Sequence, residues 1–215
     1  MGQRSNAQRA LDFVTFPFRA LALIENDRWG LSSLATERYD YCSREVIGFC
    51  LDVGCGKNNR FVTEFLNGNG VGIDSYPYEG LTDEHLVDDL TTFQFEDETF
   101  DSISFIANLS HIPESKRDQE FGEAYRVLKP NGNIIATMGN PLAEFLTHKV
   151  VWFYDKVFKT KFDMDNIRGM SEEESYFLLD PEIYERFTRA GFKRIRKKFF
   201  LTQWGLNHLF IGWKE

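Results

Sequence analysis

The sequence has little cysteine, and its cysteines lack the spacing of a metal site. Only Cys42, Cys50 and Cys55 occur in 215 residues, and none forms a Cys-x-x-Cys pair or a ligand-like cluster with histidine. This usage is typical of reduced thiols in a cytoplasmic protein. We therefore expect neither a disulfide framework nor a bound metal ion.

Long apolar runs are also missing. The most apolar segments are about ten residues long and carry charges, whereas a transmembrane helix needs about twenty apolar residues. Arg4, Arg9, Asp12 and Arg19 interrupt the N-terminal region, so it lacks the continuous apolar core of a secretory signal peptide. The sequence therefore predicts no transmembrane segment and a cytoplasmic location.

Basic residues are fewer than acidic ones. The chain has 25 Lys and Arg against 33 Asp and Glu, which gives a formal net charge of −8. A field of this sign repels phosphate backbones, so we expect no nucleic-acid partner. Phenylalanine, in contrast, is abundant, with 21 residues. Two interpretations stay open for them: a phenylalanine-rich core, or an aromatic surface around an apolar ligand.

Strand and helix patterns alternate along the middle of the chain. Short apolar runs typical of buried strands occupy 46–53, 70–74, 85–88, 100–107 and 133–138. Helical spacing of apolar residues follows the first run at 61–66 and the fourth at 113–128. This alternation predicts an α/β fold with a parallel sheet and helices on both of its faces.

The C-terminal region departs from this alternation. A helix predicted over 180–190 precedes two β-rich runs, 193–202 and 206–213, which are too close together for a crossover helix between them. Strands joined so tightly must be antiparallel. The complete prediction is a doubly wound, mostly parallel, seven-stranded Rossmann-like sheet that ends in an antiparallel hairpin.

Two segments lie outside this core. Residues 1–45 are predicted to form an N-terminal helical cap on a domain that spans 46–215. Residues 141–179 form an insertion longer than an ordinary connection. We expect both segments to contribute to a lid whose inner face is apolar and aromatic, because they carry Phe13, Phe16, Trp152 and Phe153 among others. A satellite core or an oligomer contact would explain the same aromatics.

The glycine-rich end of the first strand is the first candidate for chemistry. Asp52, Gly54, Cys55 and Gly56 end that strand and open the next helix, where glycines let a ligand approach the backbone and a helix N-terminus offers unpaired N–H groups. Asn59 stands where a dinucleotide fingerprint needs a small residue, and no phosphate loop follows. Neither a pyrophosphate nor a triphosphate is therefore the expected ligand.

Carboxylates follow the next two strands. Asp74 can accept hydrogen bonds from both hydroxyls of a ribose, or it can simply cap a turn. Asp88 and Asp89 can accept a bond from an adenine amino group, or they can belong to an exposed acidic loop. Taken singly, these residues leave both alternatives open.

Taken together, the motifs resemble those of class I S-adenosylmethionine-dependent methyltransferases. LDVGCG at 51–56, GIDSY at 72–76, VDDLTTFQFEDETFDSISF at 87–105 and EAYRVLKPNGNIIATM at 123–138 resemble successive motifs of that family. The resemblance implies S-adenosylmethionine as the cofactor and Asp89, aligned through Phe100-Asp101, as the adenine contact. Lys57-Asn58-Asn59 and Gln94 depart from the commoner family residues.

The resemblance also implies roles for individual residues. The implied cofactor-binding set is Asp52, Gly54, Cys55, Gly56, Asp74, Ser75, Asp89, Leu90 and Asn108. His111 lies just after the fourth strand and is the candidate general base for a hydroxyl acceptor; alternatively it lines the pocket or caps the helix near Pro113.

The predicted activity is methyl transfer from S-adenosylmethionine to an oxygen of a small-molecule, glycan or lipid-linked acceptor, which we expect to be apolar, aromatic or sugar-containing. A non-catalytic nucleoside-binding or scaffold protein on the same fold is the alternative.

Overall fold

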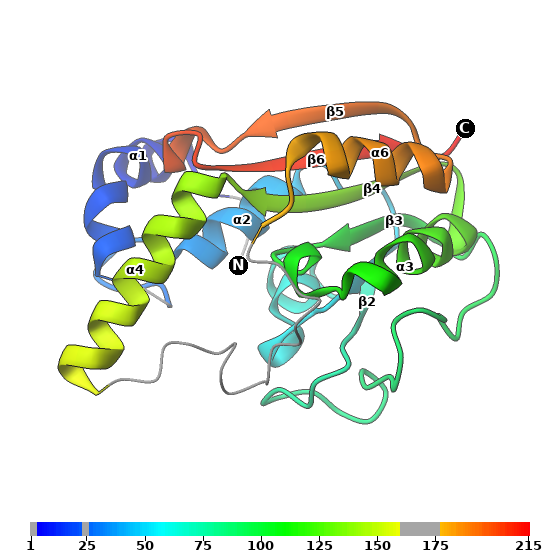
Figure 1. Ribbon diagram of the computed structural model, residues 1–215, viewed down its shortest axis with the longest axis horizontal. Helices are drawn as coiled ribbons and strands as arrows, with labels where there is room; N and C mark the ends of the chain where they lie inside the picture. The colour runs from blue at the N-terminus through cyan, green and yellow to red at the C-terminus, as the bar shows by residue number, and fades with distance from the viewer. Residues whose placement is uncertain (1–3, 23–25, 160–176) are drawn as a thin grey trace.

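The computed structural model describes residues 4–22, 26–159 and 177–215. Its centre is a six-stranded sheet with the strand order β2-β1-β3-β4-β6-β5 (Figure 1). The strands are β1 (Cys50–Val53), β2 (Gly70–Ile73), β3 (Phe100–Phe105), β4 (Leu128–Gly139), β5 (Lys193–Phe199) and β6 (Asn207–Trp213). The first four are parallel, and β6 pairs antiparallel with both β4 and β5. The predicted α/β class and the antiparallel hairpin are confirmed.

The predicted count of seven strands is wrong, because residues 85–88 do not form a strand. Leu86 makes a single parallel bridge to Asp74, with one backbone hydrogen bond on each side of it. The turn that joins His85 to Thr82 comes immediately before this bridge, and Asp88 and Asp89 enter the cavity immediately after it. Too few residues remain between them to extend the ladder.

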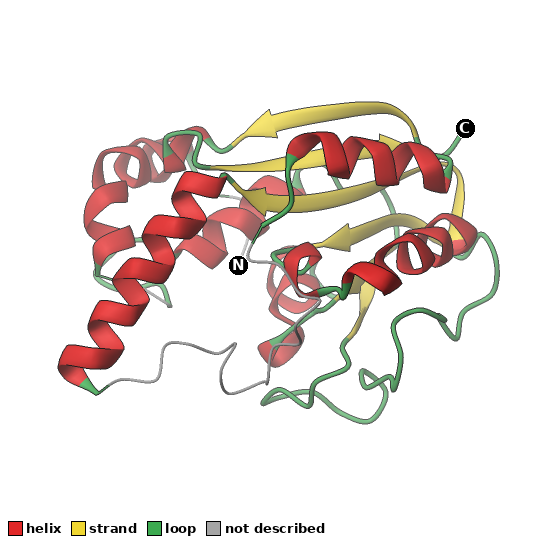
Figure 2. Cartoon of the chain, in the orientation of Figure 1, coloured by secondary structure: helices red, strands yellow, loops and turns green. Residues whose placement is uncertain are grey.

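The two faces of the sheet bury separate apolar clusters. Neighbouring residues of β4 alternate between them, so Ile134 packs into one cluster and Ile135 into the other. Helices α3 (Glu114–Val127) and α6 (Asp180–Ala190) lie side by side and cover the first cluster (Figures 1 and 2). Most of the described phenylalanines lie in these clusters, which supports the core interpretation for them.

The helix expected after β1 is irregular. A 3₁₀ turn (Lys57–Asn59) is followed by one π turn (Phe61–Phe65). Asn58 and Asn59 have φ values of +59° and +45°, and asparagine is one of the few residues that tolerates this left-handed conformation. The two asparagines therefore interrupt the helix between the glycine loop and the π turn.

The N-terminal region contains α1 (Asn6–Leu21) and α2 (Leu34–Ser43). A fully buried Arg19 of α1 donates to both carboxylate oxygens of Glu37 in α2, at 3.1 and 3.0 Å. Glu37 also accepts a 2.8 Å bond from Gln203, which lies between β5 and β6. The buried carboxylate thus ties both helices to the C-terminal hairpin.

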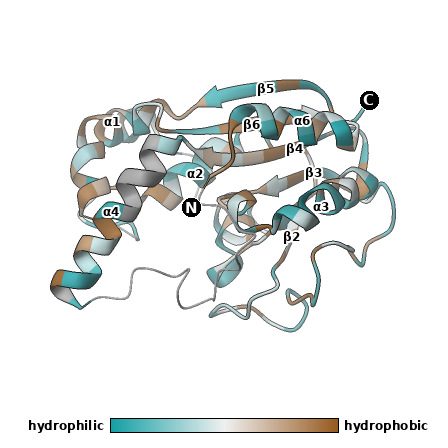
Figure 3. Cartoon of the chain, viewed as in Figure 1, coloured by the Kyte–Doolittle hydropathy of each residue, from teal (hydrophilic) through white to brown (hydrophobic). Residues whose placement is uncertain are grey.

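Helix α4 (Pro141–Phe158) follows β4, and residues 160–176 of the predicted 141–179 insertion lie outside the described part. Edge strand β5 is strongly hydrophilic (Figure 3), as expected of an edge protected by Lys and Arg against pairing with another chain. Among the described residues, no helix is long and apolar enough to cross a membrane.

Candidate functional site

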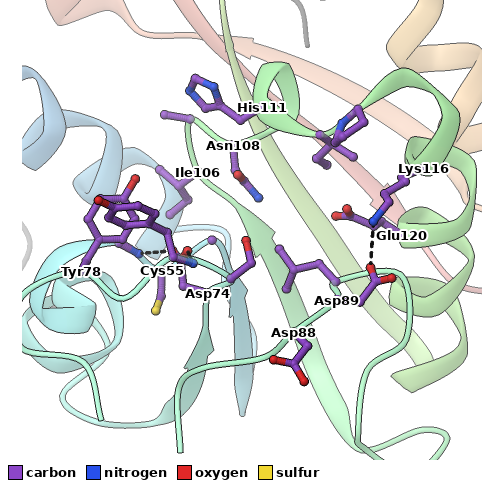
Figure 4. A pocket seen from close by; sticks show the side chains of 18 of the residues that line it. Cys55, Asp74, Tyr78, Asp88, Asp89, Ile106, Asn108, His111, Lys116 and Glu120 are labelled. Atoms are coloured by element: carbon purple, nitrogen blue, oxygen red, sulfur yellow. Dashed lines mark hydrogen bonds and ion pairs between the residues drawn. The ribbon is translucent and has the colours of Figure 1, made fainter. Parts of the chain in front are cut away.

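A cavity of about 510 Å³ lies at the carboxyl ends of the parallel strands (Figure 4). This is where ligands bind in open α/β sheets, and the volume falls in the range of small-ligand pockets. The structure places nine of the ten predicted site residues on its wall: Gly54, Cys55, Gly56, Asp74, Ser75, Asp89, Leu90, Asn108 and His111. The tenth, Asp52, lies outside the lining.

The glycine loop after β1 offers space to a ligand. Gly56 has φ +62°, and a Cβ built on it would meet no atom within 4 Å. The expected unpaired N–H groups are not found at Gly54, Cys55, Gly56, Asn58 or Asn59, because each of them donates within the protein. The left-handed asparagines replace a regular helix N-terminus, so these five N–H groups are already used within the protein.

Gly54 is required by the packing of Asn108. A Cβ on Gly54 would lie 2.5 Å from the Asn108 Cγ, and φ of Gly54 is +73°. The Asn108 side chain is held over this glycine by a 3.2 Å bond from its Nδ2 to the Val53 carbonyl. The loops after β1 and β3 are therefore fitted to one another along the cavity wall.

Asp74 is fixed by two backbone donors. Its Oδ2 accepts from Gly56 N and its Oδ1 from Tyr76 N, both at 2.9 Å, and the residue is 6% exposed. An ionised carboxylate has about four acceptor positions, so about two are left for a ligand.

Asp52 lies within the sheet, where β1 meets β3. Its Oδ1 accepts a 2.6 Å hydrogen bond from Ser104 Oγ, and the residue is buried. Burial raises the pKa of this carboxyl to about 7, the Ser104 bond opposes that rise, and the charge of Asp74 adds to it. The geometry gives Asp52 a place in joining the strands below the cavity.

Asp89 is the better held of the two acidic residues after Leu86. Its Oδ1 accepts from Thr91 N at 2.9 Å and from Lys116 Nζ at 3.4 Å. The Thr91 bond is the main cause of its lowered pKa, with a smaller contribution from Lys116. Asp88 also lines the cavity, but its carboxyl points away from that of Asp89 (Figure 4).

His111 occupies the opposite wall from Asp74. It ends the 3₁₀ turn Leu109–His111, whose backbone is held by a 2.9 Å bond from His111 N to the Asn108 carbonyl. Figure 4 shows Asn108 between the His111 ring and Asp74. An imidazole is thus placed across the cavity from the carboxylate.

Sequence reasoning missed several wall residues, among them Tyr39 from α2 and Lys116 and Glu120 from α3. Burial, together with the charge of Asp52, raises the pKa of Tyr39. Nothing in the local sequence of α2 indicates its position. The position of Glu120 is visible in the sequence, because an acidic residue there interrupts the apolar helix face that carries Phe121 and Ala124.

No group of three or more His, Cys, Asp or Glu side chains within residues 4–22, 26–159 and 177–215 is placed to hold a metal ion.

Comparison with known proteins identifies the domain. Residues 51–136 match the family model of a methyltransferase domain. The ubiquinone/menaquinone biosynthesis C-methyltransferase UbiE of Brucella anthropi is 28% identical over an alignment of 181 residues, and the alignment covers 78% of this chain. The chain spans 66% of the length of that relative.

Solved structures share the fold at low identity. A possible histamine N-methyltransferase from Thermotoga maritima aligns with a TM-score of 0.58 at 16% identity, covering 97% of this chain and 98% of that one. Phosphoethanolamine N-methyltransferase 2 from Haemonchus contortus, in complex with S-adenosyl-L-methionine, aligns with a TM-score of 0.55 at 17% identity and covers 98% and 60%. Fold and cavity define the class I methyltransferase architecture. Residues 51–136 match a methyltransferase domain, and S-adenosylmethionine-dependent methyltransferases share the fold of this chain.

The cavity residues fit the cofactor of this family. The open space at Gly56 admits a ligand against the backbone, and Asp74 keeps acceptor positions for ribose hydroxyls. Leu90 and Ile106 provide apolar wall, and Asp89 provides an acceptor. A buried oxygen of Glu120 has no partner among the described residues, so the wall has a polar atom left to satisfy.

Proposed function

We propose that this chain transfers the methyl group of S-adenosylmethionine to a small-molecule acceptor. One observation carries the proposal: Gly56, Asp74, Asp89 and Asn108 come from four different segments and line one cavity with His111. A protein that used the fold only as a scaffold would not need an imidazole opposite the ribose-binding carboxylate.

Each residue has an assigned part in holding the cofactor. Asp74 accepts from the ribose hydroxyls, and Asp89 accepts from the adenine amino group. Gly54 and Gly56 let the methionine portion lie close to the backbone. Asn108, held by Val53, lines the same portion of the cavity. Asp52 supports the loop from below through Ser104.

Methyl transfer from a sulfonium depends more on the alignment of the two reactants than on assistance from an acid or a metal ion. When bound, the sulfonium supplies a methyl group that is already electrophilic. The chain holds the acceptor in line with it and excludes water, an effect worth about 7–11 kcal/mol for well-aligned reactants. His111 would accept the proton of an acceptor hydroxyl whose oxygen receives the methyl group, and breaking of the S–CH₃ bond would leave S-adenosylhomocysteine as the second product.

We propose an apolar, aromatic or sugar-containing acceptor. Tyr39, Tyr76 and Tyr78 line the cavity, and such rings stack on flat or apolar ligands. Trp152 and Phe153 of α4 are 59% and 51% exposed. Of the α4 side chains that the structure describes, at 141, 149–157, none lines the cavity, so their part as an acceptor wall belongs to the proposal.

Methylation at carbon is the second candidate. The relative from Brucella anthropi is named a C-methyltransferase. The same imidazole would ionise a phenolic hydroxyl for attack through either its oxygen or a ring carbon. Product structure by nuclear magnetic resonance, once an acceptor is found, separates the two.

A cytoplasmic location without a nucleic-acid partner completes the proposal, supported by the net charge of −8 and by three buried free cysteines.

Titration calorimetry on Asp74→Ala tests the cofactor assignment. Losing two charge-assisted bonds costs about 2–4 kcal/mol, so affinity for S-adenosylmethionine falls about 30- to 1,000-fold. Asp83→Ala is the matched control, since Asp83 is exposed and lies outside the cavity lining. Equal affinity in wild type and Asp74→Ala would contradict the assignment, and binding of NAD in place of the sulfonium would contradict the proposed function.

A further inference from the structure

Helix α3 places an acidic side chain in its buried face. Its buried positions are Arg117, Glu120, Phe121, Ala124 and Val127. Arg117 is paired, with Nε on the Ile112 carbonyl at 2.9 Å and Nη1 on Glu182 at 3.0 Å. Glu120 is 3% exposed, and its Oε2 has no hydrogen-bond partner among the described residues. A buried polar atom without a partner is unfavourable for folding, so it calls for an explanation.

Glu120 lines the cavity next to Asp89. Figure 4 shows its carboxyl pointing from α3 toward the pocket, close to Lys116 and Asp89. Lys116, one helical turn earlier, pairs with Asp89 Oδ1 at 3.4 Å. The nearest cation is therefore engaged with the other carboxylate, and Glu120 lies at the end of the cavity assigned to adenine.

The surroundings keep Glu120 protonated at neutral pH. Burial raises its pKa to about 8, the charge of Asp89 raises it further, and Lys116 opposes the rise only in part. The other titratable groups on the cavity wall, taken from every element around it, are Tyr39, Cys55, Asp74, Tyr76, Tyr78, Asp88 and His111. A protonated carboxyl has one O–H donor and one carbonyl acceptor.

Adenine presents the complementary pair. Its amino-bearing edge combines an N–H donor with a ring-nitrogen acceptor, and the side chains that read it bidentately are those with one donor and one acceptor, Asn and Gln. A neutral glutamic acid has the same pair. An ionised carboxylate such as Asp89 can only accept, so it can take one amino hydrogen but cannot serve the ring nitrogen.

We propose that Glu120 binds the cofactor, pairing as a neutral acid with the amino-bearing edge of adenine while Asp89 accepts from the same amino group. This inference rests on the proposed function, because it needs S-adenosylmethionine in the cavity. It assigns the selectivity for adenine to two carboxyl groups in different ionisation states, one from the loop after Leu86 and one from α3.

Calorimetry with S-adenosylhomocysteine tests the assignment without depending on turnover. Glu120→Leu lowers affinity at pH 7 by about 5- to 150-fold, the loss that corresponds to one bidentate base contact. The amide of Glu120→Gln keeps a donor and an acceptor. Its affinity for S-adenosylhomocysteine should therefore stay within about threefold of wild type, because it can make the same bidentate contact. Glu114→Gln on the same helix is the control, because Glu114 is exposed and absent from the cavity lining.

Two further comparisons separate recognition from support of the fold. An analogue of S-adenosylhomocysteine without the 6-amino group binds wild type more weakly, and the loss is smaller in Glu120→Leu, where only the contact to Asp89 remains to be removed. Wild-type affinity falls as pH rises through about 8, because the ionised acid can no longer donate. Glu120→Gln carries every other titratable group of the cavity, so the difference between its pH profile and that of wild type isolates Glu120.

The outcomes distinguish the two proposals. If wild type binds neither S-adenosylmethionine nor S-adenosylhomocysteine, the proposed function falls and this inference falls with it. If wild type binds and Glu120→Leu binds equally well, the inference alone is overturned. The melting temperature of unliganded Glu120→Leu should equal or exceed that of wild type, since the change removes an unpartnered buried group. If that variant does not fold, Glu120→Gln decides through its pH profile.

Discussion

At the scale of single residues, two buried carboxyls have pKa values raised above their ordinary range. Asp52 and Glu120 have raised pKa values because burial disfavours their charged forms, whereas Asp89, held by a backbone N–H, has a lowered one. Each of these two acids ionises at a higher pH in the folded chain than in the unfolded chain. Folding is therefore linked to proton binding at both positions.

We expect Asp52→Asn to gain stability over wild type as pH rises. The pKa of Asp52 is about 7 folded and 3.8 unfolded, so wild-type stability from this group is complete below about 4 and is lost between about 4 and 7. The advantage of the amide therefore grows by up to about 1.4 kcal/mol per pH unit and levels off above pH 7. Urea unfolding without ligand at pH 5, 6, 7 and 8 measures it. A constant difference would contradict the assigned pKa.

His111→Ala should lower turnover about 10²- to 10⁴-fold, as expected for the loss of a general base. Cofactor affinity should change little, because the ring lies across the cavity from Asp74. Single-turnover kinetics with an identified acceptor provide the measurement. Turnover within a few-fold of wild type would leave His111 as part of the cavity wall.

At the scale of secondary-structure elements, local patterns predicted the sheet well and the loops less well. The apolar run at 100–107 and the helical face at Phe121 and Ala124 are set by short-range periodicity, which the sequence displays directly. The strand expected at 85–88 is absent. A strand needs neighbouring residues to pair with as well as an apolar pattern, and here Leu86 makes a single bridge to Asp74.

The sequence likewise predicted part of the candidate site. Residues after β1, β2 and β3 could be assigned because the parallel topology brings their ends together. Tyr39 could not be assigned, because only the tertiary packing of α2 brings it to the cavity. The helix expected after Gly56 became two short turns because two adjacent asparagines adopt left-handed conformations.

Helix α4 carries a prediction about the acceptor. Replacing both Trp152 and Phe153 with Ser should raise KM for the acceptor at least about tenfold, since each removes apolar area from the proposed wall. Affinity for S-adenosylmethionine should stay unchanged. Ile47→Ser is the matched control, because Ile47 is 45% exposed and precedes the amino end of β1, whereas α4 follows the carboxyl end of β4. Unchanged acceptor kinetics would argue for a different role for these aromatics.

At the scale of the whole molecule, buried charge connects the two ends of the described chain. Arg19 and Glu37 are fully buried, and Gln203 donates a further hydrogen bond to the Glu37 carboxylate. Trp204 adds a 2.9 Å bond to the Phe13 carbonyl and packs against Phe16 at 5.6 Å between ring centroids. The helices of the proposed cap are therefore bound to the hairpin of the sheet.

Glu37→Ala should destabilise the protein by about 3–5 kcal/mol, because it leaves Arg19 as a buried charge without its counter-ion. Glu64→Ala is the control: it breaks a half-exposed pair with Arg60 and should cost at most about 1 kcal/mol. Urea denaturation of both variants gives the comparison. Equal decreases in the free energy of unfolding would show that the buried pair stabilises the protein no more than the half-exposed pair does.

This connection has a consequence for the order in which the chain can fold during synthesis. Glu37 and Gln203 are 166 residues apart, and Phe13 and Trp204 are 191 apart. A ribosome that adds about 5–20 residues per second makes Glu37 roughly 8 to 33 seconds before its partner Gln203. Until then Phe13 and Phe16 are without the indole they pack against. The nascent N-terminal helices are therefore a natural client for a chaperone, and stalling of translation before Gln203 would leave them exposed to proteases.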